Sequence, residues 1–147
     1  VFRNMAEEGL LRPADVLQIG IRGPFSTRDD LAFARKVGFT VLTAEDVHRD
    51  LDGVIARIEA LPKTGPYYVS FDVDAVDPSM APGKGTPVPG GFFSWQALAL
   101  VRATRSLRVV GCAVMEVSPD FDVNQVTCLL GANLLAEMLA AIAAHRR

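Results

Sequence analysis

The segment at 70–78 reads Ser-Phe-Asp-Val-Asp-Ala-Val-Asp-Pro and holds the residues best suited to chemistry. Asp72 and Asp74 stand two positions apart, directly after the apolar and aromatic run from Tyr67 to Phe71. Because side chains at i and i+2 of a strand point to the same face, these carboxylates are predicted to project together. Neighbouring carboxylates repel each other unless they are protonated or bind cations. Oxygen ligands suit Mg²⁺, Mn²⁺ or Ca²⁺, so the pair indicates a divalent metal site.

Other interpretations of this segment remain open. Aspartate is common in turns and before proline, and we favour this structural role for Asp77, which precedes Pro78. A strand that ends in Asp-x-Asp also occurs in phosphatases of the haloacid-dehalogenase type, where the first Asp accepts the phosphoryl group and the second is an acid/base. That motif normally opens its fold, whereas this one lies in mid-chain without a later Gly-Asp-rich acidic motif. An EF-hand calcium loop fits less well, because its central Gly and terminal Glu are not at the required offsets.

The elements that must position the carboxylates alternate between strand and helix. Apolar runs predict strands at 16–21, 39–42, 67–71 and 109–117. Periodicity and end signals predict helices at 2–8, 29–37, 94–105 and 122–145, with one more apolar stripe over 47–61. This alternation implies an α/β fold with a parallel sheet and helices on both faces. Asp72 and Asp74 then fall at the carboxyl edge of the sheet, where ligands bind in such folds.

Helix-end signals refine these elements. Gly38 closes one helix, and Thr43 is predicted as the N-cap of the next. Ser94 is predicted to cap the helix that ends at about 105, and Asp122 with Gln125 resembles a capping box for the last helix. A long loop rich in proline and glycine at 75–91 follows the carboxylates, and a loop of that length inside a compact domain is usually functional.

Composition limits the classes of function. The net charge is −2 and no cluster of Lys and Arg is visible, which argues against a nucleic-acid partner. Charged residues or proline interrupt the longest apolar stretches before the roughly 20 residues of a membrane-spanning helix, so no membrane partner is expected. Cys112 and Cys128 make no disulfide framework, and we expect a cytoplasmic protein.

A long motif in this sequence resembles a signature of the arginase/agmatinase (ureohydrolase) family. Residues 70–87 read SFDVDAVDPSMAPGKGTP, against roughly S-x-D-x-D-x-x-D-P-x-x-A-P-G-T-G-T-P in the family. Residues 115–122, MEVSPDFD, look like the later E-V-x-P-x-x-D segment, and 18–23 with the first helix look most like the agmatinase branch. The resemblance implies that 1–147 form the carboxyl-terminal part of a single ureohydrolase domain with a three-layer α/β/α fold.

The resemblance also implies a reaction. Family members hold two Mn²⁺ ions and hydrolyse a guanidino compound to urea and an amine with a metal-bridging hydroxide. Asp72 and Asp74 match the last two carboxylate ligands of the metals. Glu116 matches the acid that pairs with the substrate guanidinium, a group whose planar fork suits a carboxylate. On position alone, an acid that ends an apolar strand before Ser118 also favours a functional role.

The chain departs from the family pattern in two respects. The remaining metal ligands, a His in G-G-D-H and an Asp-x-His-x-Asp cluster, are not in this sequence. The family's proton-shuttling His is expected to lie before Val1, so the catalytic residue stays unknown and the chain alone is expected to be inactive. His48 and His145 are expected to be structural or solvated. Lys84 stands where the family usually has Thr, and we expect it to be an exposed loop lysine.

Several properties stay open at this stage. The substrate is a small guanidino compound, with agmatine (of polyamine metabolism), guanidinobutyrate and guanidinopropionate as candidates. Family members commonly form trimers or hexamers, so a homo-oligomer is expected. Two alternatives to the amidinohydrolase remain, namely the Asp-x-Asp phosphatase and a non-catalytic fragment or paralogue that keeps the fold.

Overall fold

The computed structural model describes residues 2–24 and 31–145. Its strands are β1 (Leu17–Ile21), β2 (Thr40–Thr43), β3 (Tyr67–Asp72) and β4 (Val109–Met115). Its α-helices are α1 (Phe2–Glu7), α2 (Ala32–Val37), α3 (Ala44–Arg49), α4 (Leu51–Glu59), α5 (Ser94–Ala103) and α6 (Val126–Ala144). Short 3-10 turns lie at Pro13–Asp15, Val73–Ala75, Thr104–Ser106 and Pro119–Phe121. The alternation of strand and helix that the sequence predicts is confirmed, while positions 29–30 of the second predicted helix fall outside the described residues.

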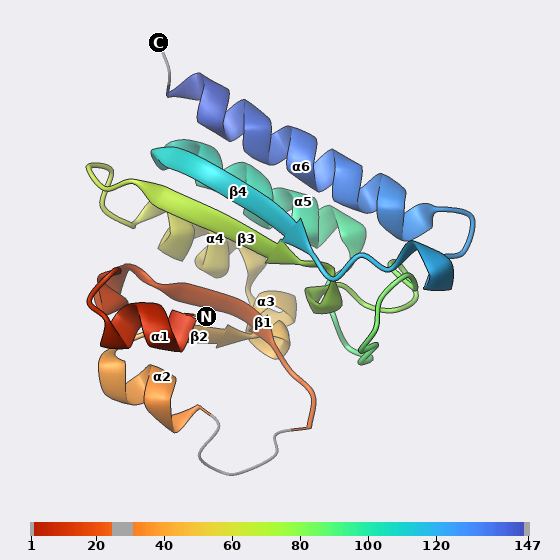
Figure 1. Cartoon of the computed structure of the whole chain (residues 1–147), viewed down its shortest axis with the longest axis horizontal. Helices are drawn as coiled ribbons and strands as arrows, with labels where there is room; N and C mark the ends of the chain where they lie inside the picture. Colours follow the sequence, from red (N-terminus) through yellow and green to blue (C-terminus); the bar gives the residue numbers. More distant parts are fainter. Residues whose placement is uncertain (1, 25–30, 146–147) are drawn as a thin grey trace.

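The strands form two parallel pairs, β1 with β2 and β3 with β4. Figure 1 shows the four arrowheads pointing to the same side of the molecule. The predicted parallel α/β architecture is therefore confirmed. The pairs do not join into one hydrogen-bonded sheet, since β1 and β3 have one strand neighbour each within the described part of the chain.

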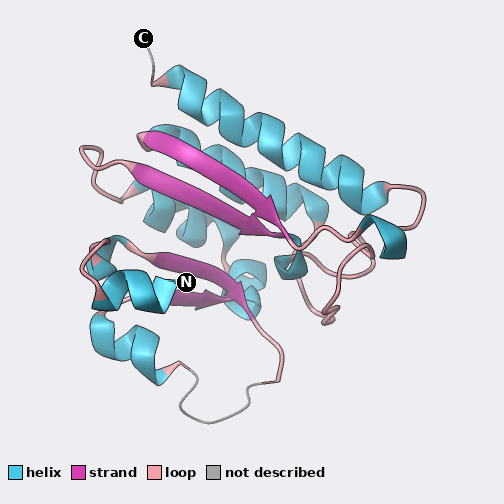
Figure 2. Cartoon of the chain, viewed as in Figure 1, coloured by secondary structure: helices cyan, strands magenta, loops and turns pink. Residues whose placement is uncertain are grey.

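The helices α3, α4, α5 and α6 contact one another in succession and pack against the strands (Figures 1 and 2). Val69 and Phe71 of β3 face the core clusters that α4, α5 and α6 help to build. On the other face of β3, Tyr68 is 62% exposed and Ser70 is also exposed. Among the described residues, these helices cover one face of β3 and leave the other face open. Asp72 follows Ser70 on the open face.

One apolar core joins the two strand pairs. It contains Leu42 of β2, Val54 and Ile58 of α4, and Val109 of β4. Full burial of such side chains contributes about 1.5–3 kcal/mol each. The chain also passes close between the pairs at Gly20, where a Cβ would lie 2.5 Å from the Phe92 ring and where φ is +93°. Glycine is required there, and the two pairs are held as one body.

The apolar stripe over 47–61 belongs to two helices and not to one. Asp50 leaves the helical conformation with φ of −152° and ψ of 74°, and its carboxylate accepts a 2.8 Å hydrogen bond from the Gly53 N–H. Asp50 therefore ends α3 and caps α4. The predicted N-cap at Thr43 is confirmed, since its hydroxyl accepts from the Asp46 N–H at 3.1 Å and the Asp46 carboxylate accepts from the Thr43 N–H at 2.8 Å.

Two predicted caps differ in the structure. Ser94 lies inside α5, and the Gln96 side chain accepts from the Phe93 N–H at 2.9 Å instead. At α6, Gln125 is the N-cap residue in a left-handed conformation with φ of 59° and makes no capping bond with its side chain. Asp122 still serves the helix start, because its carboxylate accepts from the N–H groups of Thr127 and Cys128 at 3.0 and 2.9 Å. The sequence therefore identified Asp122 as the capping acid, but the predicted capping box with Gln125 does not form.

Helix α6 is long and apolar enough to cross a membrane by length and composition alone. In the fold it lies along β4 and α5 (Figure 1), and Leu130, Leu134 and Met138 on its inner side belong to a core cluster with Phe71. Glu137 on the same helix forms ion pairs with Arg102 and Arg105. These contacts place one face of α6 against the α/β core, while Leu129 and Leu139 on the helix are exposed.

Candidate functional site

The strand register brings the predicted site residues to one edge. Asp72 at the end of β3 pairs with Met115 at the end of β4. Glu116 follows Met115 directly, and Asp74 follows Asp72 by two residues. Figure 2 shows loops gathered at the ends of these strands. Asp72, Asp74 and Glu116 therefore share the carboxyl edge of the β3–β4 pair.

Asp74 does not lie on the strand. β3 ends at Asp72, and Asp74 is the middle residue of the 3-10 turn Val73–Ala75. The Asp72 carboxylate Oδ1 accepts a 2.8 Å hydrogen bond from the Asp74 N–H and caps this turn. Strand alternation therefore does not place Asp74 beside Asp72. A turn brings the two carboxylates together, and Asp72 caps that turn.

Burial and charge act together on Asp72. Partial burial raises the pKa of its carboxyl group, the N–H of Asp74 lowers that pKa, and the nearby Asp74 carboxylate raises it again. The cations Lys84 and Arg22 act in the lowering direction. The net shift is upward, as expected for a carboxylate that loses water and lies near another negative charge. A bound cation would relieve both effects.

Asp74 has one oxygen that is satisfied and one that is not. The Thr86 hydroxyl donates a hydrogen bond to Oδ2. Oδ1 is buried and has no hydrogen-bond partner in the described structure. Buried polar atoms are nearly always paired, so an orphaned carboxylate oxygen next to a second carboxylate suits a bound cation. Thr86 did not emerge from the sequence as a functional residue, although it lies in the conspicuous 75–91 loop.

Asp77 anchors the loop that carries Thr86. Its carboxylate accepts from the Ser79 hydroxyl and N–H at 2.6 and 3.0 Å, and from the N–H groups of Gly90 and Gly91 at 2.8 and 3.3 Å. The bonds from Ser79 come first among the causes that lower the pKa of Asp77 to about 2. The predicted structural role of Asp77 is confirmed, because one carboxylate ties both ends of the loop.

Gly83 connects this loop to the segment after β4. Its carbonyl accepts from the Ser118 N–H at 2.8 Å, and its N–H donates to the Thr127 hydroxyl at 2.8 Å. A Cβ at this position would lie 2.6 Å from the Cβ of Asp122. The close approach requires glycine and holds the chain after Glu116 against the carboxylate loop.

Glu116 has an unusual backbone. Its φ is 65°, in the left-handed region that residues other than glycine rarely adopt, and it is exposed. Such strain costs about 1–3 kcal/mol and is concentrated at functional sites. The backbone therefore supports a functional position for Glu116.

Lys84 contradicts its sequence expectation. It is 2% exposed, and its ammonium donates to the carbonyls of Val73 and Val76 and not to solvent. The loop folds back over the carboxylate turn and encloses the side chain. Arg22, the first residue after β1, also donates to carbonyls of this turn. Arg22 lies at the end of a predicted strand and within the 18–23 segment that resembles the agmatinase branch, but neither feature predicts that it contacts this turn.

The residues at this edge fit part of a metal site. Across 2–24 and 31–145, no group of three or more His, Cys, Asp or Glu side chains could hold an ion. The ring of His48 contacts the Gly90 carbonyl at 3.3 Å, and that of His145 contacts the Arg105 carbonyl at 3.0 Å. Asp72 and Asp74 are thus the candidate ligands that this part of the protein contributes.

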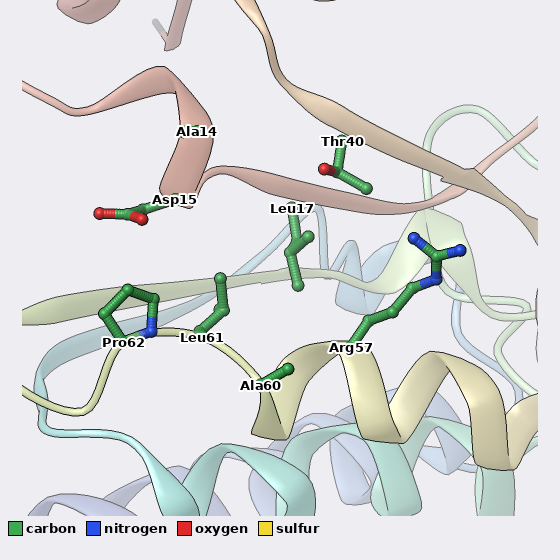
Figure 3. A pocket seen from close by; sticks show the side chains of 8 residues that line it. All are labelled: Ala14, Asp15, Leu17, Thr40, Arg57, Ala60, Leu61 and Pro62. Atoms are coloured by element: carbon green, nitrogen blue, oxygen red, sulfur yellow. The ribbon is translucent and has the colours of Figure 1, made fainter.

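A pocket of about 260 Å³ lies elsewhere in the fold (Figure 3). Leu17 and Thr40, the first residues of β1 and β2, line it together with Arg57 and Leu61 of the α4 region. It is therefore at the amino ends of the strands, opposite the edge that carries Asp72, Asp74 and Glu116. Pocket size does not identify the candidate site here, because the carboxylates lie at the carboxyl ends of the strands.

The chain is similar in sequence to known proteins over nearly its whole length. A family model described as the arginase family matches residues 1–141. A guanidinopropionase from Pseudomonas aeruginosa is 48% identical over 143 residues, which cover 97% of this chain and 45% of that protein. An agmatinase from Sodalis glossinidius is 44% identical over 147 residues, or 99% of this chain and 45% of that protein. The chain thus spans about half the length of the curated relatives it matches.

A solved structure is similar over nearly the whole chain. The proclavaminate amidino hydrolase from Streptomyces clavuligerus superposes with a TM-score of 0.91 at 42% identity, covering 97% of this chain and 48% of that one. This likeness confirms the arginase-like α/β fold, and nothing in these comparisons supports the phosphatase alternative. The carboxylate motif after β3, the acid after β4 and the family match agree, and the chain belongs to the arginase family.

Proposed function

We propose that the protein containing this chain is a manganese-dependent amidinohydrolase that cleaves a guanidino compound to urea and an amine. In this proposal residues 1–147 are the carboxyl-terminal part of a single ureohydrolase domain. The observation that carries it is the buried Oδ1 of Asp74, which has no partner among the described residues and lies near the Asp72 carboxylate.

Asp72 and Asp74 would hold the metal. Asp72 uses Oδ1 to cap the turn and Asp74 uses Oδ2 to accept from Thr86, which leaves one oxygen of each for a cation. The chain fixes both carboxylates through hydrogen bonds before a cation arrives, and this lowers the cost of ordering ligands. Bound Mn²⁺ would supply a nucleophile at neutral pH, because divalent cations lower the pKa of water.

Glu116 would bind the substrate. It is exposed at the same edge, one residue beyond the partner of Asp72 in the β3–β4 register. A carboxylate accepts two parallel N–H bonds from a guanidinium, so Glu116 can orient the planar group with its carbon toward the metal carboxylates. Holding a reactant in this orientation accounts for much of the rate advantage of a bound substrate over a free one.

The relatives suggest which substrates to try. Their names include guanidinopropionase, guanidinobutyrase, guanidino acid hydrolase and agmatinase. They share a guanidino group and differ in the rest of the substrate, so the group recognised by Glu116 is common to all. We propose a small guanidino substrate and a homo-oligomer for the full protein, as for the family. We also propose a cytoplasmic location, because Cys112 and Cys128 make no disulfide framework.

The test uses the full-length protein loaded with Mn²⁺. Urea release is measured with agmatine, 3-guanidinopropionate and 4-guanidinobutyrate, and metal content is measured on the same samples. We expect release with at least one substrate, and loss of both release and metal in Asp72→Asn and Asp74→Asn. Glu59→Gln, which changes an exposed carboxylate at the end of α4, is the matched control.

Three results would contradict the proposal. Wild-type turnover and metal content in either Asp variant would remove the carboxylates from the site. A metal-loaded wild-type protein that releases no urea from a broad guanidino panel would favour the non-catalytic paralogue. Hydrolysis of p-nitrophenyl phosphate that is lost in Asp72→Asn would instead support the phosphatase alternative.

A further inference from the structure

Two cationic side chains converge on the turn that carries Asp74. Lys84 is 2% exposed, and its Nζ donates to the Val73 carbonyl at 3.1 Å and to the Val76 carbonyl. Both carbonyls belong to the main chain that flanks Asp74. If this turn moved, the buried ammonium would lose these carbonyl partners, and unpaired buried donors are costly. The contacts therefore stabilise the turn.

Arg22 reaches the same turn from another element. It follows the end of β1, and its Nη2 donates to the carbonyls of Asp74, Val76 and Val88 at 2.5, 3.3 and 2.7 Å. Its Nε also donates to the Val88 carbonyl, at 3.2 Å. The guanidinium therefore links β1, the carboxylate turn and the far part of the 75–91 loop. Val76 is shared, since its carbonyl accepts from both cations.

Bringing two cations together needs nearby negative charge. Burial lowers the pKa of Lys84 and Arg22 lowers it further, whereas the carboxylates of Asp74, Asp77 and Asp72 raise it. The same three carboxylates act favourably on Arg22. The opposite charges therefore offset part of the repulsion between the cations and the cost of their burial.

The cations leave the carboxylates free. In the described structure, Lys84 and Arg22 donate to main-chain carbonyls, and neither forms an ion pair within 4 Å with Asp72 or Asp74. A direct pair would occupy an oxygen that a metal needs. Carbonyl contacts hold the backbone in place and leave the orphaned Oδ1 of Asp74 available.

We propose that Lys84 and Arg22 form a cationic clamp that holds the 73–76 turn in its ligand-presenting conformation before any metal binds. They are positioning residues for Asp74. The clamp also positions Thr86. The 84–88 segment holds Lys84 and the Val88 carbonyl that accepts from Arg22, and the Thr86 hydroxyl between them donates to Asp74. The link from the clamp to metal affinity rests on the proposed function, whereas the hold on the turn does not.

The test compares Lys84→Met with Lys63→Met in the full-length protein. Methionine keeps much of the length of lysine and removes its charge and donors. Lys63 is exposed and donates to the Glu59 carbonyl and the Ser106 hydroxyl, so it is the matched control for loss of a lysine. Hydrogen exchange of amides in 73–91 is measured on metal-free protein, and the Mn²⁺ dissociation constant is measured by calorimetry.

We expect exchange in 73–91 to rise at least about tenfold in Lys84→Met, since a tenfold change corresponds to about 1.4 kcal/mol. The Mn²⁺ dissociation constant should rise by a similar factor, and Lys63→Met should change neither. Arg22→Lys keeps the charge but loses the fork that bridges three carbonyls, so it should show the same two effects more weakly.

If Lys84→Met fails to fold, Lys84→Thr takes its place, because threonine is the residue usual in the family there. Wild-type exchange in these variants would overturn the clamp. Faster exchange with unchanged Mn²⁺ affinity would overturn the positioning role. If the wild-type protein itself binds no Mn²⁺, the proposed function fails, and exchange in the metal-free protein still decides whether the clamp holds the turn.

Discussion

The proposed substrate contact of the Glu116 side chain can be tested separately from the left-handed backbone at this position, because two substitutions there give different expected results. Glutamine keeps the shape of the side chain and removes its charge. Glycine removes the side chain and suits the φ of 65°. Both variants should lose activity if the carboxylate binds the guanidinium, whereas their stabilities should differ.

The expected magnitudes follow from these two roles. A hydrogen bond to a charged group contributes roughly 1.5–3 kcal/mol, and each 1.4 kcal/mol is about tenfold in rate. We therefore expect Glu116→Gln to lower kcat/KM at least about tenfold, with an unchanged Tm. In Glu116→Gly, relief of about 1–2 kcal/mol of left-handed strain outweighs roughly 0.5–1 kcal/mol of added chain entropy. The Tm of that variant should rise by about 1–3 °C.

The assay measures urea production, metal content and thermal unfolding on the same preparations of full-length protein. Glu59→Gln serves again as the control for loss of an exposed carboxylate. A stable, metal-loaded Glu116→Gln enzyme with unchanged kcat/KM would remove Glu116 from the site. A turn-capping role predicts the reverse pattern, with a lowered Tm and near-normal kinetics. A Glu116→Gly variant that melts several degrees lower would refute the argument from backbone strain.

Three further outcomes are expected. Gly83→Ala should lower the free energy of unfolding by about 1–3 kcal/mol through overpacking, because the new Cβ would lie 2.6 Å from that of Asp122. Gly85→Ala is the control in the same denaturant titration and should change little, because nothing lies within 4 Å of its Cβ. The hydrogen bond from Arg102 is the first cause that holds the pKa of Glu137 below its ordinary value. A carboxylate whose pKa is lower in the folded state stabilises the fold at pH values above its unfolded-state pKa of about 4.3. This stabilisation is lost as the pH falls through the folded-state pKa. Glu137→Gln should therefore lower the Tm at neutral pH, and its Tm difference from the wild type should shrink as the pH falls through the folded-state pKa. A constant Tm difference across pH would contradict the ion pair. The isolated chain should release no urea and bind Mn²⁺ weakly in calorimetry, because its described residues supply no group of three ligands; tight stoichiometric binding of two ions would refute this.

Much of the site was readable from local sequence. The apolar run at 67–71 fixes a strand, and the residues after it must lie at the carboxyl edge whatever the rest of the chain does. Asp77 could be identified as structural because aspartate before proline bonds to nearby N–H groups, and its contacts with Ser79 are local. The motif at 70–87 identifies the family because its residue types and spacing are specific. These features depend on near neighbours, which a linear pattern records.

What the sequence could not provide depends on contacts between distant segments. Lysine is usually exposed, and Lys84 is buried only because the loop returns to the 73–76 turn while Arg22 arrives from β1. Glu116 adopts a left-handed backbone, and Gly83 from a distant loop accepts a hydrogen bond from Ser118 two residues later, and no spacing in the sequence predicts either feature. Charges and carbonyls that are far apart in the chain meet only after folding, so the tertiary structure alone decided how the carboxylates are held.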